Sequence, residues 1–581
     1  MNKEELSAQR AEKWREELRK SRKAKERTDI PRVRMKELDP AYRITNREEV
    51  NCGLTREQAV LEATRCLDCV EPLCMTGCPV GINIPKFIKN IERGDFLSAA
   101  RTLKETSALP AVCGRVCPQE RQCESKCFYT QKLKKEPIAI GYLERFAADY
   151  EHASGEVALP AMKPCNGVKI AVVGSGPCGL SFAGDMAKWG YRVTVFEALH
   201  EIGGVLKYGI PEFRLPNEVV DVEIENLRRM GVEFMTDCIV GKTLSYDDLH
   251  EMGFKGIMVA SGAGLPRFMN IPGENLNGVM SSNEYLTRVN LMDAANPDSD
   301  TPVWRGRRVA VIGGGNTAMD SVRTARRLGA EKVMIIYRRS EDEMPARKEE
   351  IHHAKQEGVE FLTLHNPVEY IGDERGRVCQ MRLQKMELGE PDASGRRSPV
   401  PIPGAIETID IDEVIVSVGV SPNPLVPNSI EGLEVTPKGT IVVNADTLQS
   451  SIPDIYAGGD IVRGGATVIL AMGDGRRAAA AHLAGSGQQP CVGARVYHHG
   501  HLPWHHPVRL YNQLLFYRRH RIAPAADHRD GQPHRERGYE RPDRQPVPRR
   551  GRRPVRLHQQ HGRGAGRERQ DEKRLHLLHL A

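Results

Sequence analysis

Two stretches of the chain repeat one pattern: an uninterrupted apolar run, a glycine-rich turn, and then apolar residues at helical spacing. The runs are VKIAVVG at 168–174 and RRVAVIG at 307–313. An apolar run of this length that ends in glycine is typical of a buried strand in a parallel sheet. A second apolar run follows each helical pattern. Each stretch therefore predicts a βαβ unit of the kind found in dinucleotide-binding domains.

The pattern is different in the first 160 residues and in the last hundred. Residues 55–160 alternate short helical patterns with loops rich in cysteine, which predicts a small α-helical domain. Residues 1–30 are rich in Glu, Lys and Arg and predict a solvated helix that forms a surface arm. After Gly485 no periodicity persists, and His, Arg and Pro are frequent. We therefore expect a tail that is disordered or non-native.

Composition and charge limit the class of protein. Hydrophobic residues make up 40% of the 581 residues, and the mean hydropathy is −0.45. No apolar stretch approaches the ~18 residues of a membrane span, and we expect no signal peptide in the charged N-terminal segment. These features exclude a membrane protein, a secreted disulfide scaffold and a wholly disordered chain. The net charge of +7 arises in 487–581, where 19 Arg and one Lys face eight acidic residues. The remainder is mildly acidic, so no nucleic-acid partner is expected.

The first glycine-rich turn has the residues of a dinucleotide site. Between the strand and the helix lie Gly174, Ser175, Gly176, Pro177, Cys178 and Gly179. Glycine permits the tight turn and lets the backbone approach a pyrophosphate, which the positive end of the helix dipole also favours. Glu197 ends the second strand, where a carboxylate accepts hydrogen bonds from a ribose. The alternative interpretation is a tight turn without a ligand.

At the second turn, the end of the second strand is positively charged where the first has Glu197. Its residues are Gly313, Gly315, Asn316 and Thr317, and its second strand ends in Tyr337-Arg338-Arg339. Arginine pairs with a ribose 2′-phosphate, which a carboxylate would repel. This pattern predicts NADPH in preference to NADH, and the alternative is a solvated strand end.

Eight of the 14 cysteines lie between residues 66 and 127. The spacing Cys66-x2-Cys69-x4-Cys74-x3-Cys78-Pro79 is close to the bacterial iron–sulfur pattern. Cys113, Cys117, Cys123 and Cys127 follow. Structural zinc is the alternative. The segments EIGGVL at 201–206 and GGD at 458–460 resemble the flavin-contacting segments of two-dinucleotide flavoproteins, which implies hydride transfer to a flavin. Neither nucleotide region contains the C-x4-C pair of a disulfide reductase. Electrons then need another route, which favours iron–sulfur clusters over zinc.

Motifs from all these regions resemble one family. They include LDPAYRITNREEVNCGLTREQAVLEATRCLDC, LPAVCGRVCPQERQCESKC, EIGGVLKYGIPEFRLP and GGGNTAMD. Over about residues 30–485 the chain resembles the small (β) subunit of NADPH-dependent glutamate synthase. The same module is similar to the N-terminal half of dihydropyrimidine dehydrogenase and to the large subunit of NADH-dependent ferredoxin–NADP oxidoreductase. The resemblance implies FAD at the first site, NADPH at the second, and two [4Fe–4S] clusters.

The resemblance also implies a fold and a set of domains. We expect an α/β protein with two Rossmann-like dinucleotide-binding domains, for FAD and NADPH, preceded by an α-helical domain that carries the clusters. The expected segments are a charged arm at 1–30, the iron–sulfur domain at 31–160, the FAD-binding domain at 165–300 plus 415–485, the NADPH-binding domain at 301–414, and the basic tail at 486–581.

Carried over position by position, the resemblance adds site residues. For FAD it adds Gly204, Val205, Arg214, Val240, Asp460, Thr467 and Val468, and for NADPH it adds Arg347 and Gly419 to Asn316, Thr317, Arg338 and Arg339. One cluster is expected on Cys66, Cys69, Cys74 and Glu144, and the other on Cys78, Cys117, Cys123 and Cys127. A simple count would instead use Cys113 and give eight thiolates for the two clusters. Glu144 is the expected ligand even though a carboxylate is a harder and less usual ligand for iron–sulfur iron.

The resemblance finally implies a function. NADPH would reduce FAD by hydride transfer, and single electrons would pass through the two clusters to a glutamate synthase large subunit, which converts glutamine and 2-oxoglutarate to glutamate. The first alternative is the same electron-transfer module serving a dihydropyrimidine dehydrogenase or a ferredoxin–NADP oxidoreductase complex. The second is a non-catalytic assembly subunit. We expect a cytoplasmic location, because thiolate ligands need a reducing compartment, and no membrane contact.

Overall fold

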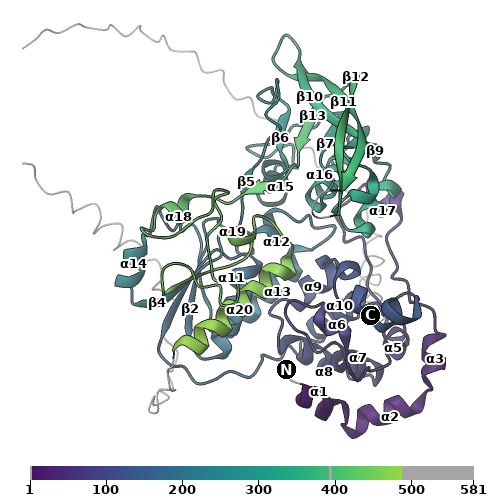
Figure 1. The fold of residues 1–581 in the computed structure, drawn as a ribbon, viewed down its shortest axis with the longest axis vertical. Coiled ribbons are helices and arrows are strands. Elements are labelled where there is room, and N and C mark those ends of the chain that lie inside the picture. Colours follow the sequence, from purple (N-terminus) through teal and green to yellow (C-terminus); the bar gives the residue numbers. More distant parts are fainter. Residues whose placement is uncertain (1–2, 392–394, 487–581) are drawn as a thin grey trace, which may run out of the picture. The chain divides into compact units, whose positions relative to one another are not determined.

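The computed structural model describes residues 3–391 and 395–486, so nearly all of the predicted tail lies outside the described residues. The predicted fold class is confirmed: two parallel α/β domains follow a helical domain (Figure 1). No helix in the described part of the chain is long and apolar enough to cross a membrane.

The N-terminal region is helical, as predicted from its periodicity. After α4 (Pro40–Arg43), the iron–sulfur domain contains α5 (Arg56–Thr64), α6 (Leu73–Thr76), α7 (Ile84–Glu92), α8 (Phe96–Lys104), α9 (Pro110–Val116), the short helices η1 (Gln119–Arg121), η2 (Glu124–Lys126) and η3 (Tyr129–Leu133), and α10 (Ile140–Ser154). Thr55, Asn83 and Asp95 cap α5, α7 and α8 with side-chain oxygens that accept backbone N–H groups. Of the eight clustered cysteines, Cys74 lies in α6 and Cys113 in α9, and the others lie in the loops beside the helices.

The prediction of one solvated N-terminal helix is wrong. The segment forms α1 (Lys3–Arg10), α2 (Lys13–Ser21) and α3 (Ala24–Thr28), and two of its arginines are buried. Arg15 and Arg19 form ion pairs with the buried Asp68, which lies between Cys66 and Cys69. Arg27 pairs with Glu92 at 2.7 Å. Charge-rich composition alone does not show that these arginines have buried carboxylate partners, and the segment fastens a cysteine loop instead of forming a free arm.

The first α/β domain is built on a five-stranded parallel sheet of order β15-β4-β1-β2-β3. Its strands are β1 (Lys169–Val173), β2 (Arg192–Phe196), β3 (Glu233–Met235), β4 (Phe254–Val259) and β15 (Ile455–Ala457). Its helices are α11 (Pro177–Lys188), α12 (Val205–Tyr208), α13 (Asn217–Arg229), α14 (Tyr246–Glu251), α18 (Leu425–Asn428), α19 (Asp460–Arg463) and α20 (Val468–Ser486). The long α20 packs on α11, and both share one hydrophobic core with the iron–sulfur domain.

The second α/β domain repeats this design in a sheet of order β6-β13-β7-β8-β9. Its strands are β6 (Val279–Ser281), β7 (Arg308–Ile312), β8 (Lys332–Tyr337), β9 (Glu360–Thr363) and β13 (Glu413–Val416), and its helices are α15 (Ser282–Leu291), α16 (Asn316–Arg327), η4 (Glu341–Glu343) and α17 (Lys348–Gln356). In this sheet β13 pairs with both β6 and β7. With boundaries at 300 and 414, β6 is expected in the FAD-binding domain, so the expected boundaries are wrong for this strand. An apolar run shows that a strand is buried but not which sheet it joins.

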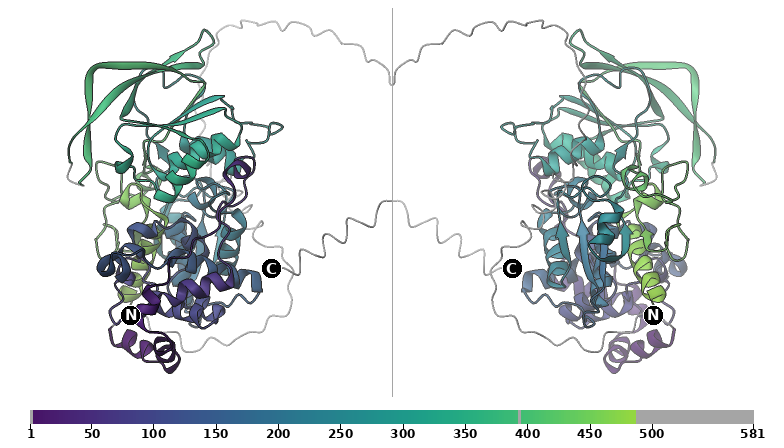
Figure 2. Two further views of the ribbon diagram at one scale, coloured as in Figure 1. Left: turned by 90° about the vertical axis from the view of Figure 1, so that its right-hand side faces the viewer. Right: turned by 90° about the vertical axis from the view of Figure 1, so that its left-hand side faces the viewer.

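A third sheet was not predicted. It is antiparallel, has the order β10-β11-β12, and consists of β10 (His365–Gly372), β11 (Val378–Pro391) and β12 (Arg397–Asp410). The strands are largely half-buried or exposed, so they lack the apolar runs by which the other strands were found. Figure 2 shows this sheet beside the second parallel sheet, against which β10 and β11 pack. The short strands β5 (Leu265–Pro266) and β14 (Val420–Ser421) pair where the chain passes between the two α/β domains.

Candidate redox site

The first glycine turn joins β1 to α11. Gly174 has φ +103°, and a Cβ there would lie 2.5 Å from the carbonyl oxygen of Ala260, so only glycine fits. A Cβ on Gly176 would meet no atom within 4 Å. The turn is therefore closed on the side of β4 and open at Gly176, which faces the beginning of α11. An anion such as a pyrophosphate could approach the backbone there.

Glu197 is held against this turn. Its carboxylate accepts hydrogen bonds from the backbone N–H of Ser175 at 2.9 Å and from Ser175 Oγ at 2.5 Å, and it is almost fully buried. Ser175 Oγ in turn accepts the N–H of Gly203 at 2.9 Å. These bonds bring the end of β2 and the 203–204 segment to the turn, as the sequence predicted for Glu197 and Gly204.

Segments distant in sequence meet at the same turn. Gly204 has φ +54°, and a Cβ there would lie 2.9 Å from the Cα of Gly176, which places Val205 and α12 beside the turn. A Cβ on Gly459 would lie 3.0 Å from the Cβ of Cys178, so the residue before Asp460 packs on the first turn of α11. Asp460 accepts the N–H of Ala466 at 2.9 Å, and burial raises the pKa of its carboxyl group. The remaining predicted FAD residues include the buried Val240, in the core beside the sheet, and Thr467 and Val468, where α20 begins.

The second turn has the same backbone design. Gly313 has φ +140°, and a Cβ there would overlap the carbonyl oxygen of Ser417, while a Cβ on Gly315 would meet no atom within 4 Å. Asn316 and Thr317 begin α16 directly after the turn, and Asn316 Oδ1 accepts the backbone N–H of Arg347 at 2.9 Å. Gly419, with φ +111°, follows β13.

The end of β8 is rich in arginine. Arg338 is exposed, and Arg339 Nε donates to the carbonyl oxygen of Arg397 at 2.8 Å. Arg396, directly before β12, donates to Tyr337 Oη at 2.7 Å and to the carbonyl oxygen of Glu343 at 3.0 Å. The sequence analysis missed Arg396, because it lies 59 residues beyond Tyr337 and carries no motif of its own.

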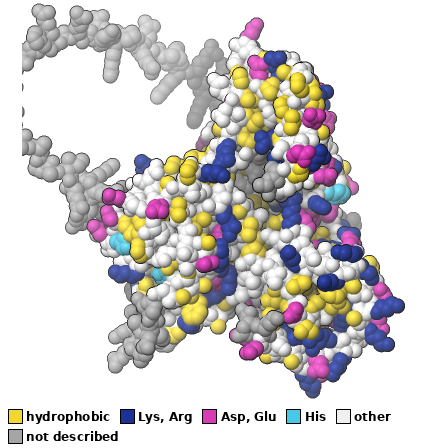
Figure 3. Space-filling model, in the orientation of Figure 1, with side chains coloured by type: hydrophobic (Ala, Val, Ile, Leu, Met, Phe, Trp, Pro, Cys, Tyr) yellow, Lys and Arg dark blue, Asp and Glu magenta, His cyan; other side chains and the backbone are white. Residues whose placement is uncertain are grey.

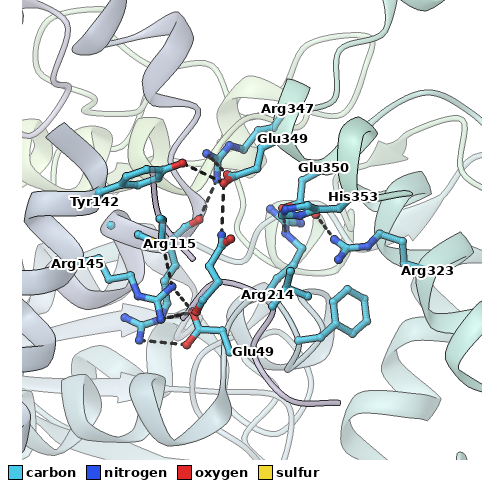
Figure 4. A pocket seen from close by; sticks show the side chains of 15 residues that line it. Glu49, Arg115, Tyr142, Arg145, Arg214, Arg323, Arg347, Glu349, Glu350 and His353 are labelled. Atoms are coloured by element: carbon cyan, nitrogen blue, oxygen red, sulfur yellow. Dashed lines mark hydrogen bonds and ion pairs between the residues drawn. The ribbon is translucent and has the colours of Figure 1, made fainter. Parts of the chain in front are cut away.

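Two predicted site residues point elsewhere. Arg214 donates two hydrogen bonds to Asp320 at 2.8 and 2.7 Å, and Arg347 donates to the carbonyl oxygen of Arg115 at 2.8 Å and to Gln119 at 3.1 Å. Both line a pocket between the domains (Figure 4). In this pocket Arg347 lies beside Glu349. Arg115 and Arg145 are both directed at Glu49. Their guanidinium groups therefore join domains in this structure and are not directed at the predicted FAD or NADPH turns.

Electrostatics stabilise that junction. Glu350 is buried, which by itself would raise the pKa of its carboxyl group. Arg214 and Arg323 outweigh the effect of burial and hold this pKa at about 2. A carboxylate that stays charged in the interior needs such partners, so breaking one of them leaves an uncompensated buried charge.

The first group of cysteines lines a pocket of its own. Cys66, Cys69, Cys74 and Cys127 face it together with apolar side chains such as Ile84 and Ile88. Burial raises the pKa of the Cys74 thiol, and the neighbouring Cys66, Cys127 and Cys69 raise it further. Four sulfurs that converge on one apolar pocket are the donor set that an iron–sulfur cluster uses.

The second group is more deeply buried and contains a carboxylate. Burial raises the pKa of the Cys123 thiol, and Cys78 and Glu144 are among the neighbours that raise it further. Cys117 is next to Cys113 and also has Glu144 and Cys123 as neighbours. Burial raises the pKa of Glu144 to about 8, and its Oε1 atom has no hydrogen-bond partner within the described part of the protein. A buried carboxylate oxygen without a partner is costly unless it binds something, which fits a cluster ligand.

The predicted division of the ligands is therefore corrected. Cys127 lies with Cys66, Cys69 and Cys74, whereas Glu144 lies with Cys78, Cys117 and Cys123. The spacing of cysteines along the chain does not show that the loop after η2 folds back onto the first cysteine loop. Cys113, the alternative ligand, has its Sγ 3.5 Å from Met472 Sδ on α20.

Comparison with known proteins identifies the two parts of the chain separately. Residues 43–156 match the family of dihydropyrimidine dehydrogenase domain II, 4Fe-4S cluster, and residues 168–476 match the pyridine nucleotide-disulphide oxidoreductase family. The glutamate synthase [NADPH] small chain of Halomonas elongata is 37% identical over 429 residues, which are 73% of this chain and 89% of that one. The chain belongs to the glutamate synthase small-chain family. The small chain of Escherichia coli K12 is 35% identical over 428 residues, 73% of this chain and 90% of its own.

Another relative belongs to a different enzyme. The β subunit of an NADP(+)-dependent formate dehydrogenase from Moorella thermoacetica is 37% identical over 430 residues, 70% of this chain and 59% of that one. The comparisons confirm the predicted family, the enzyme class and the kinds of cofactor, while the number of clusters stays a prediction. This member of the small-chain family is an NADPH-dependent flavin oxidoreductase with FAD and an iron–sulfur domain of the 4Fe-4S type.

Proposed function

We propose that the chain is the electron-input subunit of a glutamate synthase, which takes electrons from NADPH and delivers them to a large subunit. FAD accepts a hydride and releases single electrons, and a 4Fe-4S cluster carries one electron at a time. The observation that carries the proposal is the packing of the second cysteine group on α20. Cys113 Sγ lies 3.5 Å from Met472 Sδ, and Gly473 leaves room for Pro79, which follows Cys78. The same helix begins at Val468, directly after Thr467, and both are predicted flavin residues.

Each dinucleotide turn would hold its cofactor by backbone N–H groups at the start of a helix. At the first turn, Gly174, Gly176 and Gly179 permit this approach, and Glu197 would accept the ribose hydroxyls. At the second turn, Gly313 and Gly315 serve the pyrophosphate, while Arg338 and Arg339 would pair with the 2′-phosphate. Arg396 would add a third guanidinium at the end of β8.

We propose two cluster sites, each with four ligands. Cys66, Cys69, Cys74 and Cys127 would hold one cluster, and Cys78, Cys117, Cys123 and Glu144 the other. Glu144 is favoured over Cys113 because its buried oxygen has no partner among the described residues, whereas the Cys113 thiol contacts Met472. Thiolate ligation of this kind supports the expected cytoplasmic location.

An anaerobic absorbance titration with NADPH, repeated with NADH, tests the proposal. We expect flavin and iron–sulfur absorbance to bleach together. Because of its 2′-phosphate contacts, NADPH should act at a concentration at least ~10-fold lower than NADH. Bleaching of flavin without any cluster absorbance would remove the route out of the flavin. No bleaching in a folded protein would favour the non-catalytic assembly subunit.

The partner needs a separate experiment. Reduced protein is mixed with a glutamate synthase large subunit, glutamine and 2-oxoglutarate, and glutamate formation is followed. The formate dehydrogenase relative makes a different partner the second candidate, because its β subunit is as similar to this chain as the glutamate synthase small chains are. Glutamate formation would decide between the two.

A further inference from the structure

The pocket of the first cysteine group opens at an apolar surface. Among the residues that line it, Leu73 is 45% exposed and Phe128 is 38% exposed. Val70, in the same loop as Cys69, is 73% exposed, and Leu133, at the end of η3, is 37% exposed. We call these four side chains the apolar collar. Exposed hydrophobic side chains gathered around one opening are a common mark of a binding surface.

The two loops that carry the collar are in contact. Helix α6, which begins at Leu73, packs against η2, and η2 packs against η3. In the first group Cys66, Cys69 and Cys74 are half-buried and Cys127 is buried, whereas in the second group only Cys78 is half-buried and Cys117 and Cys123 are buried. The first cysteine group is therefore the nearer of the two to solvent.

Lysine residues flank the collar residues Phe128 and Leu133 along the chain. Lys126, Lys132, Lys134 and Lys135 are exposed in the segment that follows Cys123, and Lys135 pairs with Asp29 at 3.5 Å. Of the acidic residues in the two loops, Asp68 and Glu124 are buried and paired with arginine, Glu136 is exposed and paired with Arg34, and Glu71 is exposed. The space-filling view shows hydrophobic side chains over the iron–sulfur domain with Lys and Arg side chains around them (Figure 3). The rim of this surface is thus positively charged.

We propose that the collar and its lysine rim dock a protein electron acceptor that presents an acidic rim around a small apolar patch. This inference rests on the proposed function, because only an electron acceptor has reason to approach the first cysteine group. Opposite charges would steer the acceptor and orient it, while the collar excludes water at the contact. A second copy of this chain fits less well, since a two-fold interface would bring identical lysine rims together.

The test uses the full-length holoprotein and a charge reversal of the rim. Lys132→Glu/Lys134→Glu is compared with the control Lys242→Glu/Lys438→Glu, which alters exposed lysines of the first α/β domain. The probes are a glutamate synthase large subunit and, separately, an acidic [2Fe–2S] ferredoxin. Affinity is measured by sedimentation, and NADPH-dependent ferricyanide reduction is measured in parallel because a small acceptor needs no docking.

We expect the rim variant to bind the large subunit at least ~10-fold more weakly, with ferricyanide reduction unchanged and the control unaffected. Binding by the unaltered protein should also weaken as salt is raised. Equal binding by the rim variant would overturn the docking surface and leave the proposed function intact. Binding of ferredoxin alone, lost in the rim variant, would support the surface and refute the large-subunit partner. Binding of neither probe would refute both.

Discussion

The two glycine turns share one backbone and differ in the charge placed beside it. In each, the first glycine has a positive φ and no room for a Cβ, and the third position is open. At the end of the second strand, however, the first domain has a buried Glu197 that bonds to Ser175, and the second has an exposed Arg338. Under the proposed function, the turn would bind a pyrophosphate and the residue at the strand end would select the ribose.

The surroundings of the turns differ as well. The first is enclosed by the 203–205 segment and by Gly459, both of which reach back to it from distant parts of the chain. The second is bordered at the end of β8 by exposed arginine and by the antiparallel sheet. An enclosed site suits a cofactor that stays bound, and an open one suits a substrate that must leave after each turnover. The glycines and arginines can be altered one at a time to test this.

The largest effect is expected from Gly174→Ala. The new Cβ would lie 2.5 Å from the Ala260 carbonyl oxygen at a φ of +103°. Strain of ~1–3 kcal/mol at such a backbone position would distort the turn and leave the protein almost without FAD. The FAD-to-protein ratio after purification measures this. Gly485→Ala, near the end of α20 where a Cβ meets only Tyr456 Oη at 4.0 Å, is the control and should retain FAD.

Gly313→Ala should separate the two turns. Its Cβ would overlap the Ser417 carbonyl oxygen, so the second turn is distorted while the first is untouched. We expect full FAD content with kcat/KM for NADPH reduced ~100-fold or more, which corresponds to ~2.7 kcal/mol of lost binding. Stopped-flow reduction of the bound flavin by NADPH gives the measurement. Loss of FAD in this variant would show that the two turns are not independent.

The sequence predicted both turns because their signals are local. A strand, a turn and a helix follow one another within about 20 residues, and β1, α11, β7 and α16 all formed where expected. The features that were missed depend on contacts between distant segments. Cys127 lies beside Cys66 because a loop folds back, and Arg15 forms a buried ion pair with Asp68. Arg396 reaches the end of β8 from the segment before β12. Spacing and composition carry no information about such contacts.

Arg338→Ala should change cofactor preference more than stability. The side chain is exposed, so its removal leaves no buried partner uncompensated. A lost charge-assisted contact to the 2′-phosphate, worth ~1.5–3 kcal/mol, should raise the KM for NADPH ~10-fold or more and leave that for NADH unchanged. Steady-state reduction of ferricyanide with each nucleotide measures the ratio. An equal rise for both nucleotides would refute a role specific to the 2′-phosphate.

The smallest effect is expected from Arg396→Ala. Its guanidinium already donates to Tyr337 Oη and to the Glu343 carbonyl oxygen, so it would meet the 2′-phosphate as a supporting charge and not as the main partner. We expect a rise of ~2- to 5-fold in the KM for NADPH, consistent with a partly screened interaction of under ~1 kcal/mol, and none for NADH. Arg396→Lys should recover part of the preference, because charge is kept while the forked geometry is lost. If Arg396 only braces Tyr337, the lysine variant should behave like alanine and both nucleotides should bind more weakly. The pair of variants therefore distinguishes a phosphate contact from a structural brace, and decides whether the antiparallel sheet belongs to the NADPH site.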